Sequence, residues 1–136
     1  GVSDYVFVCL PLTAETRHII NAAALDAMRP EAVLINAGRG GLVDQGALLH
    51  ALDTAGIAGA GLDVFTPEPL SPDSPLLRHP RVLATPHIAG VTDRSYARVA
   101  RQIAQMVEAV AAQAPLPHCL NWPAVAARIY TTPPGG

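Results

Sequence analysis

The alternation of short apolar runs with helix-like segments most constrains how this chain can fold. Four runs rich in apolar or β-branched residues predict strands at residues 5–10, 32–36, 57–64 and 81–85. Helical patterns predict helices at residues 22–28, 45–55 and from Thr92 onward. Strands that alternate with helices in this order are typical of a parallel sheet with crossover helices. The sequence therefore predicts an α/β fold.

The expected helix ends follow from capping chemistry. Asn21 and Asp44 are good N-caps for the first two helices, and Gly56 is expected to supply the left-handed residue that ends the second. After Thr92 the apolar side chains recur at spacings of three and four, which predicts a long amphipathic helix. The Pro-rich stretch 66–80 is expected to be a loop.

Composition excludes several classes of protein. With 50% apolar residues and a net charge of -2, the chain is not disordered, and the lack of a Lys/Arg cluster argues against nucleic-acid or membrane-surface binding. Without a long apolar stretch or a basic N-terminal region, we expect no membrane span or signal peptide, and a cytoplasmic protein. Cys9 and Cys119 lack metal-ligand spacing, so no metal site is expected.

The low charge content points to a partner surface. Charged residues make up 15% of this chain, against about 25% in a typical globular protein. A surface built from so few charges must contain apolar area, and exposed apolar patches promote association. We therefore expect a homo-oligomer formed through exposed apolar surface.

Polar residues follow three successive expected strands, at the carboxyl ends where open parallel sheets bind ligands. They are Arg39, Glu68 and His87. Taken singly, each has a simpler interpretation, as a surface arginine in a turn, a solvated glutamate or a structural histidine. Together they provide a guanidinium for a carboxylate, an imidazole for proton transfer and a carboxylate to hold that imidazole. The combination indicates an acid–base site.

Four motifs in order resemble the D-isomer-specific 2-hydroxyacid dehydrogenase family, over roughly residues 4–123. They are Cys9-Leu10-Pro11-Leu12-Thr13 with Thr16, Leu34-Ile35-Asn36-Ala37-Gly38-Arg39-Gly40-Gly41-Leu42-Val43-Asp44, Gly61-Leu62-Asp63-Val64-Phe65 with Glu68-Pro69, and Thr85-Pro86-His87-Ile88-Ala89-Gly90.

The resemblance implies an enzyme that interconverts a D-2-hydroxy acid and its 2-keto acid with NAD or NADP, NAD being favoured. It implies that Arg39 binds the substrate carboxylate and that His87, paired with Glu68, exchanges a proton with the hydroxyl oxygen. The residues that it implies for cofactor binding are Leu10, Pro11, Thr16, Ala37, Gly38, Arg39, Asp63, His87 and Gly90.

The chain also departs from the family pattern. Complete members begin with a substrate domain and a strand–helix unit carrying Gly-x-Gly-x-x-Gly, whereas the glycines of residues 56–61 enter a strand. The resemblance therefore implies a partial Rossmann-like doubly wound sheet, the nicotinamide half, followed by the long helix. We expect residues 1–113 to form this half and its closing helix. Residues 114–136 are expected to be a tail that packs on the absent substrate domain or is mobile.

Two other interpretations stay open at this point. The chain could be a non-catalytic scaffold or binding protein that keeps the dehydrogenase frame, as the related corepressors do, or a truncated product without function. Because the dinucleotide fingerprint is missing, we expect the isolated chain to be inactive.

Overall fold

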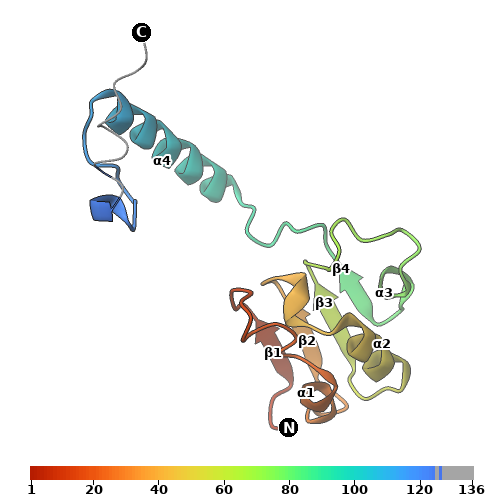
Figure 1. The fold of residues 1–136 in the computed structure, drawn as a ribbon. Coiled ribbons are helices and arrows are strands. Elements are labelled where there is room, and N and C mark those ends of the chain that lie inside the picture. Colours follow the sequence, from red (N-terminus) through yellow and green to blue (C-terminus); the bar gives the residue numbers. More distant parts are fainter. Residues whose placement is uncertain (125, 127–136) are drawn as a thin grey trace. The chain divides into compact units, whose positions relative to one another are not determined.

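The computed structural model describes residues 1–124 and 126, and the chain divides into two compact units, Gly1–Ala89 and Gly90–Gly136. In the first unit the strands, all parallel, lie in the order β1-β2-β3-β4 (Figure 1). They are β1 (Tyr5–Val8), β2 (Val33–Asn36), β3 (Gly59–Leu62) and β4 (Val82–Ala84). The predicted α/β fold with a parallel sheet is confirmed.

The strand register brings four loops to one edge of the sheet. Val8 lies beside Asn36, Asn36 beside Leu62, and Leu62 beside Ala84, so the four strands end level with one another. The segments that follow the strands therefore leave the sheet at the same edge. These segments contain most of the candidate site residues that were predicted from the sequence.

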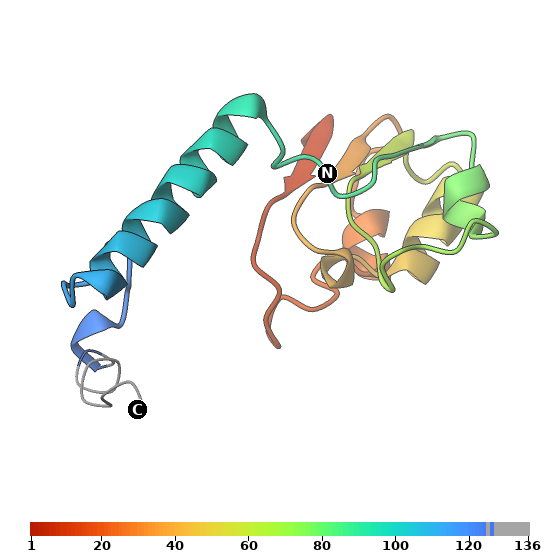
Figure 2. The same ribbon diagram turned by 90° about the horizontal axis from the view of Figure 1, so that it is seen from above.

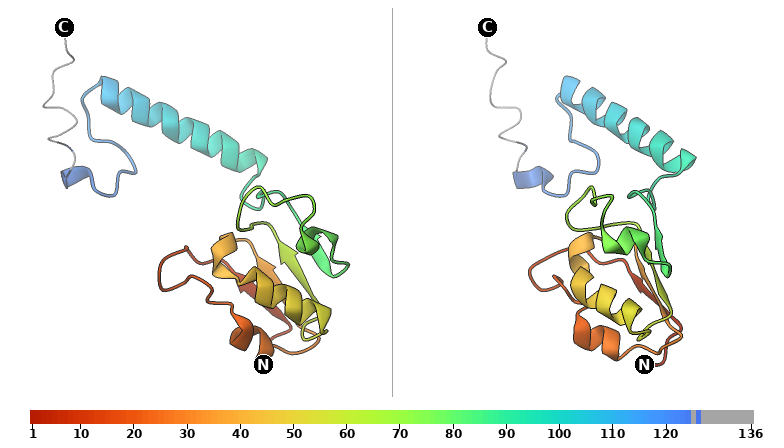
Figure 3. Two further views of the ribbon diagram at one scale, coloured as in Figure 1. Left: turned by 45° about the vertical axis from the view of Figure 1, so that its right-hand side comes forward. Right: turned by 90° about the vertical axis from the view of Figure 1, so that its right-hand side faces the viewer.

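Helices cover one face of this sheet. Figures 2 and 3 show α1 (Ala22–Asp26) and α2 (Gln45–Asp53) on the same side of the strands. The core beneath them is built from alternate strand residues and the apolar sides of the helices, including Val8, Leu34, Leu62, Leu25, Leu48 and Leu52. The opposite face carries Phe7 and Leu83, which are 66% and 72% exposed.

The strands and helices are shorter than the sequence predicts. The register pairs Val33–Asn36 only with Gly59–Leu62, so the flanking parts of the expected strand 57–64 lie outside the ladder. Helix α2 ends at Asp53 rather than at residue 55, and the left-handed residue after it is Ala55 (φ 57°), not Gly56. That prediction was wrong because hydrogen bonds from Ala55 and Gly56 back to Leu52 and Ala51 close the turn one residue earlier.

The Pro-rich loop contains a helical turn that the sequence analysis missed. Helix α3 (Pro75–Arg78) starts with proline at its first position, where a missing N–H costs nothing. Its Leu76 is buried in the core.

Close packing also explains one small residue of β3, since a Cβ on Gly59 would lie 2.9 Å from the carbonyl oxygen of Arg81.

The second unit contains α4 (Asp93–Ala111), the predicted amphipathic helix. Thr92 and Ser95 form a capping box at its start, and none of its residues is buried. Among the described residues, no helix is long and apolar enough to span a membrane. The first compact unit ends at Ala89, whereas the sequence analysis places a domain boundary after residue 113. That boundary stays a prediction. Part of the expected tail 114–136 lies outside the described residues.

Candidate functional site

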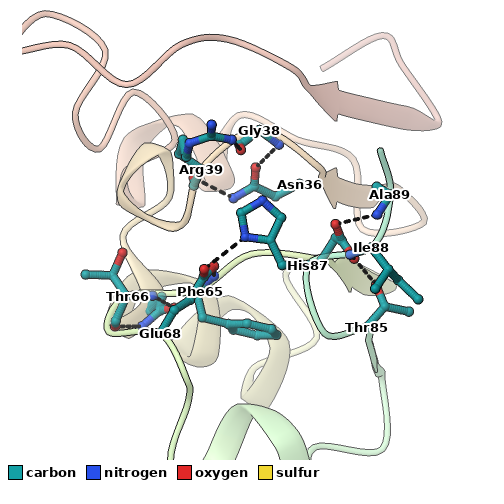
Figure 4. Close-up of polar contacts among 12 residues, drawn as sticks. Asn36, Gly38, Arg39, Phe65, Thr66, Glu68, Thr85, His87, Ile88 and Ala89 are labelled. Carbon is teal, nitrogen blue, oxygen red and sulfur yellow. Dashed lines mark hydrogen bonds and ion pairs between the residues drawn. The ribbon is translucent and has the colours of Figure 1, made fainter. Parts of the chain in front are cut away.

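The turn that carries Arg39 is shaped by the buried side chain of Asn36 (Figure 4). The Asn36 Oδ1 accepts a hydrogen bond from the Gly38 amide, and its Nδ2 donates to the Arg39 carbonyl, both at 3.1 Å. Asn36 is the last residue of β2 and only 1% exposed. One amide side chain thus fixes both peptides of the turn directly at the end of the strand.

The guanidinium of Arg39 is exposed above this turn. Its Nη1 donates to the Gly38 carbonyl at 2.7 Å. Among residues 1–124 and 126, no carboxylate lies within ion-pair distance of it. The remaining N–H groups of the guanidinium fork can therefore meet a planar anion such as a carboxylate in bidentate fashion.

A hollow of about 490 Å³ lies beside the Arg39 turn at the ends of β1 and β2. Its lining includes Leu10, Pro11, Ala37 and Gly38, four of the residues that the resemblance assigns to the cofactor. Thr16 is not among the lining residues. Its hydroxyl instead donates to the Pro11 carbonyl and accepts from the Thr13 amide, both at 2.7 Å, so it shapes the loop behind that lining.

Glu68 and His87 form an ion pair at the ends of β3 and β4. The His87 Nδ1 lies 3.0 Å from Glu68 Oε2, and the Phe65 amide donates to Glu68 Oε1 at 2.7 Å (Figure 4). The Phe65 amide first, and then His87, hold the pKa of the Glu68 carboxyl below its ordinary value. An ionised carboxylate only accepts hydrogen bonds, so His87 donates from Nδ1 and its Nε2 is left to exchange a proton with a ligand.

Asp63 anchors the loop that carries His87. The Asp63 Oδ1 accepts from the Thr85 hydroxyl and the Ile88 amide, and Oδ2 accepts from the Ala89 amide. Burial acts to raise the pKa of Asp63, but these hydrogen bonds outweigh it and keep the pKa below its ordinary value. Asp63 is 7% exposed, and the lone pair of Oδ2 that Ala89 leaves free can still accept one hydrogen bond.

His87 adopts a left-handed backbone conformation, with φ at 57°. Few residues other than glycine take this conformation, and histidine is among those that do so more often. The His87 amide donates to the Asp63 carbonyl at 2.9 Å, so the backbone of Asp63 as well as its carboxylate holds the turn. Such a conformation persists only where the surroundings fix it, as at ligand-binding sites.

A second cavity, of about 530 Å³, opens beside the Glu68–His87 pair. Most of its lining is apolar, and it includes Phe65, Pro69, Leu70, Leu77, Ala84 and Pro86. Asp63, Glu68 and His87 also line it, so the pair lies at the wall of a largely apolar chamber. The two side chains are 47% and 37% exposed, so solvent still screens the electrostatic interaction within the pair.

The first unit thus brings most of the predicted site residues to one sheet edge. Gly90 belongs to the second unit, so its place relative to this edge is not assigned. Sequence reasoning missed Asn36 and the contact of Gly40 with Phe65, where an added Cβ would lie 1.9 Å from the Phe65 carbonyl oxygen. The paired glycines 40 and 41 were the available signal for a close backbone approach.

Comparison with known proteins identifies the family. Residues 1–89 match the family described as D-isomer specific 2-hydroxyacid dehydrogenase, NAD binding domain. The chain is 46% identical over 120 residues to a glyoxylate/hydroxypyruvate reductase B of Pectobacterium atrosepticum. The matched region covers 88% of this chain and 37% of that protein.

Solved structures agree with this match. A protein from Thermus thermophilus superposes with a TM-score of 0.80 at 40% identity, over 85% of this chain and 37% of the other. The NADPH-dependent glyoxylate/hydroxypyruvate reductase of Sinorhizobium meliloti, in complex with NADP and malonate, gives a TM-score of 0.71 at 42% identity, over 78% and 33%. This chain spans little more than a third of the length of such relatives. It belongs to the D-isomer-specific 2-hydroxyacid dehydrogenase family, and its first 89 residues correspond to the NAD-binding domain of that family.

Proposed function

We propose that the chain is the C-terminal part of an NAD(P)-dependent oxidoreductase that interconverts a D-2-hydroxy acid and its 2-keto acid. The observation that carries the proposal is the Glu68–His87 pair at the sheet edge where the Arg39 guanidinium has no carboxylate partner among the described residues. The names of the relatives favour glyoxylate or hydroxypyruvate as the keto acid.

In this proposal Arg39 binds the substrate carboxylate through its guanidinium fork. A bidentate contact fixes the orientation of the neighbouring carbonyl, and the positive charge stabilises the negative charge that develops on the carbonyl oxygen. The position of Arg39 supports this role. Its guanidinium is exposed to a ligand, and the hydrogen bonds of Asn36 fix the backbone of the turn that carries it.

His87 is the proposed proton donor during reduction. A bound reduced nicotinamide would supply the hydride to the carbonyl carbon and become oxidised. Nε2 of a protonated His87 would give its proton to the carbonyl oxygen, which yields the hydroxy acid and leaves a neutral imidazole that still donates from Nδ1 to ionised Glu68. In the oxidative direction Nε2 takes the hydroxyl proton back, and Glu68 stabilises the imidazolium that forms.

NAD or NADP is the proposed cofactor. The hollow at the ends of β1 and β2 has the size of an ordinary ligand pocket and lies where parallel sheets bind nucleotides. Leu10, Pro11, Ala37 and Gly38 would contact the cofactor there, while Thr16 would support the loop. Asp63 has a remaining lone pair for an amide donor, and Gly90 stays a proposed contact in the second unit.

We also propose that the isolated chain does not turn over substrate and that it self-associates through exposed apolar surface. It covers about a third of the relatives' length, and the pyrophosphate of a dinucleotide normally binds at a Gly-x-Gly-x-x-Gly strand–helix turn, which the described residues do not contain. A cytoplasmic location stays a prediction.

Calorimetric titration of the chain with NADPH and with NADH is the first test, with the mass in solution recorded in the same buffer. The second uses a chimera in which the N-terminal part of the Pectobacterium reductase precedes this chain. Reduction of glyoxylate or hydroxypyruvate by the chimera would support the proposal. A folded chimera that binds NADPH but reduces neither acid would contradict it and favour the scaffold alternative.

A further inference from the structure

The side-chain amide of Gln45 binds both backbone groups of one residue in the loop that carries Glu68. The Gln45 Nε2 donates to the Thr66 carbonyl at 2.6 Å, and the Thr66 amide donates to Gln45 Oε1 at 3.0 Å. Dashed lines mark these bonds at Thr66 in Figure 4. Gln45 is the first residue of α2, so the helix after the Arg39 turn is tied directly to the loop after β3.

The amide side chain of Gln45 is suited to this pair of bonds. It offers an acceptor oxygen and a donor nitrogen side by side, whereas an ionised carboxylate offers acceptors alone. Glutamate at this position would keep the bond from the Thr66 amide, but would place an oxygen against the Thr66 carbonyl. The two bonds therefore depend on glutamine chemistry and not merely on a side chain of this length.

A second contact joins the same two segments. Gly40 packs so closely on Phe65 that an added Cβ would lie 1.9 Å from the Phe65 carbonyl oxygen. The segment from Arg39 to Gln45 therefore meets the loop after β3 at two successive residues, Phe65 and Thr66. Two contacts fix the spacing of the segments more tightly than one.

One of the two clamped residues, Phe65, also holds Glu68. The Phe65 amide donates to Glu68 Oε1, and the other carboxylate oxygen reaches His87. Because Phe65 and Thr66 are adjacent in the chain, a shift of Thr66 moves the amide that orients Glu68. A misplaced Glu68 would lose either the Phe65 bond or the His87 bond.

We propose that Gln45 is a positioning residue of the active site, which holds Thr66 so that Glu68 reaches His87 at a fixed distance from the Arg39 turn. The inference rests on the proposed function for its catalytic consequence. The positioning itself concerns hydrogen bonds of this chain and is measurable without any turnover.

The test compares Q45M, which keeps the length of the side chain and removes both bonds, with the unchanged chain by NMR. In Q45M we expect hydrogen exchange of the Thr66 amide to accelerate about twofold to tenfold, as for the loss of one hydrogen bond. We also expect the Glu68 carboxyl pKa to rise toward its ordinary value. The ¹⁵N signals of the His87 ring should show loss of the preferred Nδ1–H form.

Two further variants separate positioning from general stability. Q45E should keep the slow exchange of the Thr66 amide at pH 7, because its carboxylate still accepts that bond. Q105A changes an exposed glutamine of α4 and should leave all three signals unchanged. Unchanged Glu68 and His87 signals in a folded Q45M, whatever its melting temperature, would overturn the proposal.

Activity measurements on the chimera test the catalytic consequence of the positioning by Gln45. Q45M should lower kcat by about tenfold to a hundredfold, as small displacements of catalytic groups do, with KM for the keto acid nearly unchanged. If the Q45M signals shift as expected but no chimera reduces a keto acid, the proposed function fails and the positioning role stands. If the chimera works and Q45M leaves kcat unchanged, the positioning role fails alone.

Discussion

At the scale of single residues, His87 carries the most specific expectation. In the chimera described above, H87A removes the group that exchanges the proton, and general acid–base catalysis typically contributes about 10²–10⁴ in rate. We expect kcat for glyoxylate reduction to fall by that factor, with NADPH affinity little changed. His50 is exposed on α2 and away from the sheet edge, so H50A is the matched control. A decrease of less than about tenfold in H87A would identify another proton donor.

Asp63 gives a prediction about stability and pH. Its pKa is lowered in the folded chain, so its stabilising contribution is complete above the ordinary aspartate value of about 3.9 and is lost as the pH falls through the folded-state value. At pH 7 we expect D63N to lower the free energy of unfolding by about 1–3 kcal/mol, because an amide nitrogen would face a backbone N–H. The difference should shrink as the pH falls through the lowered folded-state pKa of Asp63, because the carboxyl is then protonated.

Urea unfolding at several pH values measures this difference. Asp26 is an exposed aspartate of α1, so D26N is the control for loss of one charge. A D63N effect that stayed as large at the lowest pH at which the chain is still folded as at pH 7 would show that the hydrogen bonds do not depend on the ionised carboxylate.

The residue types of the site could be predicted because polar groups after apolar runs are conspicuous in the sequence. Arg39 lies between glycines, Glu68 between prolines and His87 after a proline, in the segments that follow three expected strands, and the parallel order predicts that they share an edge. Asn36 and Gln45 could not be found in this way. Their function depends on which backbone groups lie opposite them, and that spacing exists only after the loops have folded.

At the scale of elements, alanine substitutions of Gly40 and Gly46 are expected to have opposite effects on stability. A Cβ at Gly40 would overlap the Phe65 backbone, so G40A must push the Arg39 turn away from the loop after β3. We expect a loss of about 1–3 kcal/mol or more in the free energy of unfolding, as for overpacked cores. At Gly46 the nearest atom, Asp44 Oδ1, is 3.4 Å away. G46A should therefore raise stability by about 0.5–1 kcal/mol through helix propensity.

Chemical unfolding of the two variants checks both signs. Fluorescence or circular dichroism gives the free energies, and amide exchange at Phe65 and Thr66 shows whether G40A displaces the expected loop. A neutral effect of G40A would contradict the close approach at Gly40, and destabilisation by G46A would contradict the expected gain in helix propensity at Gly46.

Element order was easier to predict than element length. The order follows from where apolar runs occur, and every predicted strand and helix has a counterpart in the structure. Length depends on neighbours, since a strand such as β3 ends where β2 and β4 leave its sides. The turn α3 was missed because its prolines and polar residues are typical of loops, although Leu76 anchors it in the core.

At the scale of the whole molecule, the uncovered face of the sheet predicts self-association. Phe7 and Leu83 are more than half exposed and lie at the same level across the sheet, with Ile35 and Gly61 between them. Large exposed apolar patches on a single chain drive association in water. We expect the mass in solution, measured by light scattering after size-exclusion chromatography, to rise with protein concentration above that of one 14.2 kDa chain.

A charged side chain on this sheet face should prevent the self-association. L83K places a charged ammonium on the apolar sheet face, and a charge buried in an interface without a partner is costly. We therefore expect L83K to remain at the mass of one chain at concentrations where the unchanged chain associates. Q105K adds the same charge to α4 and should associate like the unchanged chain if the sheet face is the contact. If L83K associates like the unchanged chain, the sheet face is not the contact, and the apolar row of α4 is the alternative, because Tyr96, Val99 and Ile103 on that helix are also exposed.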